Sequence, residues 1–86
     1  MKSITFSPKA LRQLDEWKIA DPKMLLKIVS LIVETANNPF SGTGKPEPLK
    51  HQLKGKWSKR INQEHRLVYE VKEDTIEIIS CRYHYE

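Results

Sequence analysis

Cysteine is almost absent from this sequence. The chain has one, Cys81, so it can form no internal disulfide. Small secreted domains commonly depend on several disulfides, whereas the reducing cytosol keeps thiols free, and we therefore expect a cytoplasmic protein. The single cysteine and the three histidines also show no spacing typical of a metal site, so the sequence predicts neither a metal nor another cofactor.

Long hydrophobic runs are missing too. The first residues, MKSITFS, are too few and too polar to form the apolar core of a signal peptide. The most apolar stretch, residues 24–33, is interrupted by Lys27 and Ser30 and is far shorter than the ~20 residues that span a bilayer. No contact with a membrane is expected. With 86 residues, the chain predicts one domain, 1–86, with a small core and a surface groove instead of a deep pocket.

Acidic residues are scarce in the middle of the chain. The formal net charge of the whole sequence is +4, but residues 40–69 contain seven lysines and arginines against two acids. Such a concentration of positive charge indicates a polyanionic partner such as RNA or DNA. On charge alone, a lysine-rich surface that binds nothing is an equal alternative.

The first half of the sequence contains two helix starts. A short strand is expected before them, over residues 2–6. Ser7-Pro8 and Asp21-Pro22 each join a capping side chain to a proline that suits the first helical position. The second helix should run to about Ala36. Its polar residues form one narrow stripe, so we expect it to bury more than one side, against a sheet and against the first helix or a second subunit.

Three strand-like runs fill the last third of the chain, over residues 57–61, 65–71 and 75–83. The polar breaks between them are short, which is typical of antiparallel hairpins. Before them, Leu49 and Leu53 indicate a helical turn or a short strand. The predicted class is therefore α+β, with two N-terminal helices packed on one face of a small antiparallel sheet and the other face open.

The loop GTGKPEPLKH holds Glu47 between two prolines and among lysines. Arg66 lies near the start of one predicted strand and His84 near the end of the next, so antiparallel pairing brings these two ends together. A carboxylate, a guanidinium and an imidazole can cleave RNA without a metal, because they can supply a base, a charge-stabilising cation and an acid. Each residue also has a simpler interpretation, as part of a surface ion pair or as an exposed tail histidine. His51 and His65 fit surface or strand positions.

Four segments in order, GTGKPEPLKH, GKWSKRI, QEHRLVYEV and CRYHY, resemble the YoeB/Txe branch of the RelE-type toxins. The resemblance spans almost the whole chain and implies a microbial-ribonuclease-like α+β fold. It further implies a metal-independent endoribonuclease that cleaves messenger RNA in the ribosomal A site and so inhibits translation. The resemblance also implies a homodimer and a YefM/Axe-like antitoxin with an acidic C-terminal segment.

The same resemblance assigns a role to each matching position. It implies that Glu47 is the general base, Arg66 the group that stabilises the transition state and His84 the general acid. Contacts with RNA are implied for four further residues, Lys50, Lys59, Arg60 and Tyr85. Members of the family often carry arginine in place of Lys59 and often end at the tyrosine, whereas this chain continues to Glu86.

Two other classes of function stay open at this stage. A non-catalytic RNA- or ribosome-binding module would use the same basic segment, and its binding would survive the loss of Glu47 and His84. An interaction protein would use the basic surface only to receive an acidic partner. An acidic open reading frame beside this gene would support the toxin interpretation.

Overall fold

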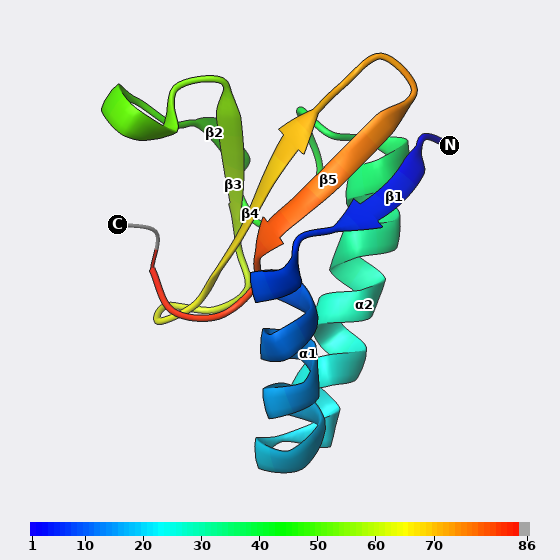
Figure 1. Ribbon diagram of the computed structural model, residues 1–86, viewed down its shortest axis with the longest axis vertical. Helices are drawn as coiled ribbons and strands as arrows, with labels where there is room; N and C mark the ends of the chain where they lie inside the picture. The colour runs from blue at the N-terminus through cyan, green and yellow to red at the C-terminus, as the bar shows by residue number, and fades with distance from the viewer. Residues whose placement is uncertain (85–86) are drawn as a thin grey trace.

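The computed structural model describes residues 1–84. In chain order its elements are β1 (Ser3–Phe6), α1 (Pro8–Ala20), α2 (Pro22–Asn37), β2 (Glu47–Pro48), the single 3-10 turn η1 (His51–Leu53), β3 (Lys56–Arg60), β4 (Arg66–Val71) and β5 (Thr75–Ser80). Figure 1 shows α1 and α2 on one side of the sheet, while η1 and the segment after β5 lie on the other side. The predicted α+β class, with both N-terminal helices on one face, is confirmed.

The strands are ordered β1-β5-β4-β3-β2 across the sheet. The meander of β3, β4 and β5 is antiparallel, as its short polar turns predict. By contrast, β1 runs parallel to β5, with Ser3 beside Thr75, so the sheet is mixed. The expectation of a purely antiparallel sheet missed this pairing, because an alternating segment indicates a strand without indicating which edge it joins.

Ser7 sets the start of α1 and ties that helix to the sheet. Its hydroxyl oxygen accepts the N–H of Ala10 at 3.0 Å, as an N-cap does, while the hydroxyl donates to the carbonyl of Ile79 at 2.7 Å. Asp21 caps α2 by accepting the N–H of Met24 at 3.2 Å. Each cap stabilises its helix by about 1 kcal/mol. Both predicted helix starts are confirmed.

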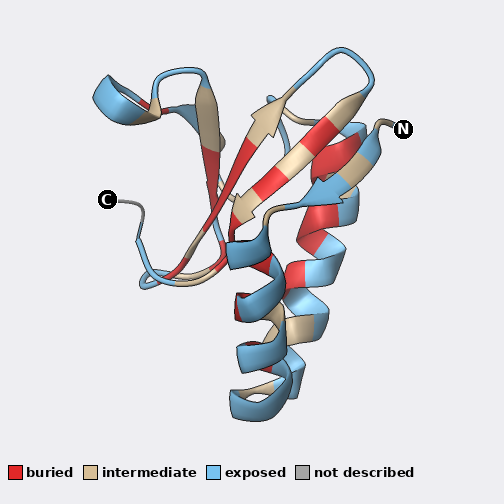
Figure 2. Cartoon of the chain, viewed as in Figure 1, coloured by how far each residue is buried: buried red, intermediate tan, exposed pale blue. Residues whose placement is uncertain are grey.

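The core lies between the helices and the sheet, and Figure 2 shows buried segments on α1, α2, β4 and β5. Its buried members are Ala10, Trp17, Ile28, Leu31, Ile32, Ala36, Ile61, Leu67, Tyr69, Ile76, Ile78 and Cys81. Tyr69 is fully buried, and its hydroxyl donates to the carbonyl of Pro39. This hydrogen bond attaches the loop that follows α2 to the core.

Part of the apolar surface of α2 is not covered by the described chain. Leu26, Val29 and Val33 lie at helical spacing on one side and are 70%, 45% and 44% exposed. The helix packs on the sheet and on α1, as its pattern predicts, but this further apolar side stays at the surface. A contiguous apolar patch of this kind is typical of a protein interface. Within residues 1–84, no helix has the length and apolar character needed to cross a bilayer.

Gly44 allows the loop before β2 to lie directly on the end of β3. Its φ is +92°, and its carbonyl accepts the N–H of Arg60 at 2.7 Å. A Cβ at this position would stand 2.9 Å from the carbonyl oxygen of Arg60 and 3.0 Å from the Cβ of Lys59. Gly55 has nearly the same φ, +94°, but a Cβ there would meet no atom within 4 Å.

Gly44→Ala is therefore expected to lower the free energy of unfolding by about 1–3 kcal/mol more than Gly55→Ala does. Both variants place an alanine in the same left-handed conformation, so the difference between them measures the close approach to β3. Urea titrations followed by tryptophan fluorescence supply both values. Equal losses would mean that the loop moves away from β3 without cost.

Candidate functional site

The register of β2, β3 and β4 decides which side chains face away from the helices. Residues paired across neighbouring strands share a face, and neighbours along one strand alternate. Trp57 pairs with Tyr69, and both pack into the core beneath the helices. Ser58 pairs with Glu47 on one side and with Val68 on the other. These three side chains therefore lie on the helix-free face of the sheet.

Arg66 begins β4 on the same helix-free face. Its Nη1 donates to three carbonyl oxygens of the preceding turn, at 2.7 Å to Asn62, 3.3 Å to Gln63 and 3.0 Å to His65. Among the described residues, Arg66 forms no ion pair with Glu64, so the simpler interpretation of this arginine is not supported. The carbonyl groups fix the orientation of the guanidinium without cancelling its charge, which is the arrangement that stabilisation of a developing anion requires.

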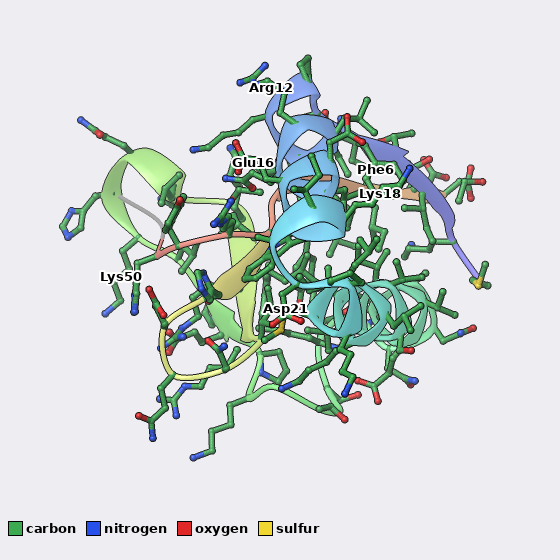
Figure 3. All side chains as sticks on the ribbon, turned by 90° about the horizontal axis from the view of Figure 1, so that it is seen from below. Phe6, Arg12, Glu16, Lys18, Asp21 and Lys50 are labelled. Atoms are coloured by element: carbon green, nitrogen blue, oxygen red, sulfur yellow. The ribbon has the colours of Figure 1, made fainter. Side chains whose placement is uncertain are left out.

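The loop that carries Glu47 borders a hollow in the surface. Residues 47–53 line a pocket of about 510 Å³, at which Glu47 and Lys50 are both exposed. Figure 3 shows Lys50 at the η1 end of the molecule, far from α1. The predicted surface groove is therefore present, with a carboxylate and an ammonium group at its wall.

Strained backbone gathers beside the predicted catalytic residues. Three residues other than glycine have a left-handed conformation in the described chain: Lys45, His51 and Tyr83, with φ of 50°, 58° and 64°. Each costs about 1–2 kcal/mol, and such conformations cluster at functional sites. Lys45 lies two residues before Glu47, His51 stands in the pocket wall, and Tyr83 directly precedes His84.

The segment after β5 returns the chain to Arg66. β5 ends at Ser80, three residues before its predicted end, and a bulge interrupts its pairing with β4. The carbonyl of Tyr83 accepts the backbone N–H of Arg66 at 3.0 Å, so the predicted meeting of these two strand ends is confirmed. His84 follows directly and is exposed. Figures 1 and 3 both show this segment running toward the side where η1 lies.

His65 occupies a position that the sequence does not predict. His65 directly precedes β4 in the chain, and its imidazole is buried. The imidazole meets the ring of Trp17 edge to face, at 4.8 Å between ring centroids. Its Nδ1 accepts the N–H of Tyr83 at 2.7 Å. No local pattern could have indicated this, because Trp17 and Tyr83 belong to α1 and to the end of the chain.

Lys59 points toward the helices and away from the helix-free face of the sheet. Its side chain is fully buried, and its ammonium group donates to the carbonyl of Asn38 at 3.1 Å and lies 3.7 Å from a carboxylate oxygen of Glu34. The alternation along β3 explains this, since Lys59 follows Ser58 and therefore faces the helices. The structure assigns Lys59 to the packing of α2 on β3 and does not support the RNA contact predicted for it.

Glu34 joins three parts of the chain through this buried contact. Burial lowers the pKa of Lys59 from its ordinary value, and the carboxylate of Glu34 opposes that shift. The pKa of Glu34 is itself lowered, first by the hydroxyl of Thr43, which donates to the carboxylate at 3.0 Å, and further by Lys59. The carboxylate thus connects α2, the loop before β2 and β3.

Arg60 stands apart from the pocket that residues 47–53 line. It is exposed, pairs in register with Arg66, and borders a second hollow of about 420 Å³ together with residues of α2. The residues predicted to contact RNA are thus divided, with Lys50 at the first hollow and Arg60 at the second. Tyr85, the remaining one, lies outside the described residues.

Metal and thiol chemistry find no support in the described part of the chain. Within residues 1–84, no three histidine, cysteine, aspartate or glutamate side chains come together as a metal site. Cys81 is buried beside Ala10, and burial raises the pKa of its thiol to about 12, so it is not a thiolate at neutral pH. The candidate catalytic groups that remain are the carboxylate of Glu47, the guanidinium of Arg66 and the exposed imidazole of His84.

A small α+β protein with a basic middle segment and these groups near a helix-free sheet face fits the RelE-type toxins that the sequence resembles. The family model of the YoeB-like toxin of bacterial type II toxin–antitoxin systems matches residues 6–85. Toxin YoeB of Escherichia coli K12 is 55% identical over 69 residues, which cover 80% of this chain and 82% of the relative. Toxin YoeB of Mycobacterium bovis is 47% identical over 85 residues, 99% of this chain and 100% of the relative. The chain belongs to the YoeB-like toxins of type II toxin–antitoxin systems.

Solved structures share the fold. The YoeB dimer of Staphylococcus aureus matches with a TM-score of 0.87 at 47% identity, over 98% of both chains. The heterotetrameric YoeB–YefM complex of the same organism matches with a TM-score of 0.87 at 46% identity, over 99% of both chains. The toxin–antitoxin complex RelBE2 of Mycobacterium tuberculosis, at 22% identity and a TM-score of 0.77 over 96% of this chain and 98% of that chain, shares the fold alone. The RelE-type α+β fold implied by the resemblance is confirmed.

Lys59 and Arg60 are neighbours on β3, but the first is buried and the second is exposed. Lys59→Ala is expected to lower the free energy of unfolding by about 2–4 kcal/mol, because it leaves a cavity and takes from the carbonyl of Asn38 its hydrogen-bond donor. Arg60→Ala removes an exposed side chain from the same strand and should change that free energy by less than about 0.5 kcal/mol. Urea denaturation of both variants tests the assignment, and a small loss for Lys59→Ala would contradict it.

Proposed function

We propose that this toxin is a metal-independent endoribonuclease that cleaves messenger RNA in the A site of the ribosome and so inhibits translation. Glu47 acts as general base, Arg66 stabilises the charge of the transition state, and His84 acts as general acid. One observation carries the proposal: Glu47 and Arg66 share the helix-free face, and the N–H of Arg66 binds Tyr83, the residue before His84. Membership of the family supports it.

The proposed reaction begins at a ribose 2′-hydroxyl of the messenger RNA. Glu47 removes its proton, and the 2′-oxygen attacks the adjacent phosphorus atom. Arg66 donates hydrogen bonds to the phosphate oxygens as negative charge develops on them. His84 gives a proton to the 5′-oxygen as its bond to phosphorus breaks. The products are a 2′,3′-cyclic phosphate, or a 3′-phosphate after hydrolysis, and a 5′-hydroxyl, and side chains carry both protons.

Substrate alignment is divided between the protein and the ribosome in this proposal. Lys50 binds phosphate at the pocket beside Glu47, and Arg60 binds RNA at the second hollow. Tyr85 stacks on a base or orients the phosphate, as the family resemblance implies. A protein of this size offers an open face and no enclosed cavity, so the decoding site supplies the opposite wall. This assignment makes the protein cytoplasmic.

Two protein partners follow from the family. The Staphylococcus aureus relative forms a dimer in one structure and a complex with YefM in another. We propose a homodimer for this chain and neutralisation by a YefM/Axe-like antitoxin whose acidic C-terminal segment covers the basic segment 40–69. The exposed apolar side of α2, formed by Leu26, Val29 and Val33, offers a surface for one of these contacts.

Glu47→Gln and His84→Ala are each expected to lower the rate of messenger RNA cleavage by a factor on the order of 10² or more, because each removes a proton carrier from the transition state. Ribosomes programmed with a defined messenger RNA, incubated with the purified protein in EDTA, allow the cut ends to be mapped. Wild-type cuts at the A-site codon that disappear in both variants are the expected result.

Glu73→Gln is the matched control for Glu47→Gln, since Glu73 is an exposed acid in the turn between β4 and β5. It should cleave at the wild-type rate. A loss below about threefold in Glu47→Gln would remove Glu47 from the role of base. Tight ribosome binding without any cut RNA would favour the non-catalytic binding module, the second candidate function, which the basic segment also supports.

Arg66→Ala is expected to lower turnover by about 10²–10³-fold while the affinity for programmed ribosomes changes by less than about threefold, because its contact strengthens only in the transition state. Single-turnover cleavage and a ribosome-binding titration separate the two quantities. Arg12→Ala is the control, since Figure 3 shows Arg12 on α1 pointing away from the sheet. Equal losses of binding and turnover would make Arg66 a phosphate anchor.

A further inference from the structure

The segment after β5 is held by side chains that take no part in the proposed chemistry. Gln13 of α1 accepts the N–H of Cys81 at 2.6 Å, and the indole N–H of Trp17 donates to the carbonyl of Cys81 at 3.0 Å. The guanidinium of Arg82 lies 5.0 Å from the centre of the Trp17 ring. These contacts bring the chain to residue 82, but they do not determine the direction in which it continues to His84.

That direction is set at Tyr83. Its φ of 64° is left-handed and unfavourable for a tyrosine, so the conformation must be held from outside. Two adjacent residues hold it: Nδ1 of His65 accepts the N–H of Tyr83 at 2.7 Å, and the N–H of Arg66 donates to the carbonyl of Tyr83 at 3.0 Å. The turn at Tyr83 therefore connects the proposed transition-state arginine to the segment that carries the proposed acid, His84.

This geometry determines which nitrogen of the His65 ring carries the proton. Because Nδ1 accepts a hydrogen bond, the neutral ring carries its proton on Nε2, which lies 3.6 Å from a carboxylate oxygen of Glu64. The ring is buried between Trp17 and Tyr83, at 4.8 and 5.7 Å between ring centroids. A second proton on Nδ1 would set one N–H against another, and the hydrogen bond to Tyr83 would be lost.

We propose that His65 is a positioning residue whose neutral imidazole holds the turn at Tyr83 and so aims His84, and that protonation of His65 releases this turn in acid. The proposal rests on the proposed function in one respect, the catalytic role of His84. The hydrogen bond and its loss are properties of the fold alone, and they are measurable without RNA.

Among the described residues, the groups whose charge acts on the ring are Glu64, Arg66, Arg82 and His84, and the phenol of Tyr83 packs against it. From α1, Glu16 acts on this set through Arg82, which it meets at 2.9 Å. Figure 3 shows Glu16 on the side of α1 that is turned toward the η1 end of the molecule. The carboxylate of Glu64 favours protonation of the ring, while the cations oppose it.

Burial is the largest of these influences, and it lowers the pKa of His65 below the ordinary histidine value. When the turn opens, the ring meets water and its pKa returns toward that value, about 6.5. The open state therefore binds more protons than the held state, and acid favours opening. The stabilisation that neutral His65 gives to the turn is fully present above about pH 6.5 and declines as the pH falls through the lowered pKa of His65.

The variants His65→Asn and His65→Leu form a matched pair. Their side chains are nearly isosteric and leave the same gap beneath Trp17, but only asparagine offers an oxygen close to the position of Nδ1. Asparagine also cannot be protonated between pH 5 and 8. A difference between the two variants therefore reports the hydrogen bond to Tyr83, and a difference between wild type and His65→Asn reports the titration.

The first readout is the exchange protection of the Tyr83 amide, measured by nuclear magnetic resonance on the full-length ¹⁵N-labelled protein from pH 8 to pH 5. Corrected for the intrinsic pH dependence of exchange, protection should fall with pH in wild type, stay constant in His65→Asn and be absent at every pH in His65→Leu. Protection that stays constant with pH in wild type, or that is equal in the two variants, would overturn the proposal. If His65→Leu does not fold, the pH dependence of Tyr83 amide protection in wild type and in His65→Asn still tests whether protonation of His65 releases the turn.

The second readout is cleavage on programmed ribosomes as a function of pH. His65→Leu should lower kcat by a factor on the order of 10² with little change in KM, because a misplaced His84 loses reactivity and not affinity. His65→Asn should keep most of the activity and retain it to lower pH than wild type. Equal kcat in the two variants would overturn the positioning role. If wild type cleaves no RNA, the proposed function fails while the amide measurement still tests the turn.

Discussion

The period of two along β3 and β4 is the constraint on which the rest of this structure depends. It sends Lys59 and Tyr69 toward the helices and leaves Ser58 and Arg66 on the free face. A slip of one residue would exchange the two sets, burying the guanidinium of Arg66 and exposing the ring of Tyr69. The register is secured by apolar packing and by the buried ammonium of Lys59, whose partners lie at the end of α2.

α1 contributes to the proposed site without supplying a catalytic group. Its start is attached to β5 through Ser7, and two turns of its inner side bind Cys81 through Gln13 and Trp17. The proposed base and the proposed cation therefore stand on a hydrogen-bonded sheet, whereas His84 stands on a short segment that polar contacts hold. Segments with few buried apolar contacts open at lower cost than sheets, so this segment is where the geometry of the site is most easily changed.

The helix starts, the antiparallel meander and the family could be predicted from the sequence, because the signals for them are local. Caps and prolines located both helix starts, alternation located the meander, and ordered motifs identified the family. Apart from the parallel pairing of β1 and the early end of β5, the errors concern buried polar groups. Lys59 belongs to a basic segment and His65 to a polar turn, and nothing in their neighbourhood indicates burial. Their partners, such as Asn38 and Trp17, are distant in the chain, and alternation alone does not tell a buried lysine from an exposed one.

By itself the sequence determined which segments become helices and strands, where the positive charge lies and to which family the chain belongs, since each of these depends on residues close together in the chain. Only the tertiary structure decided that β1 joins β5 in parallel, that Lys59 is buried, and that His65 and Arg66 together hold the turn before His84. These outcomes depend on which distant segments meet and with what register. That is settled by the packing of the whole core and leaves no signature at the residues themselves.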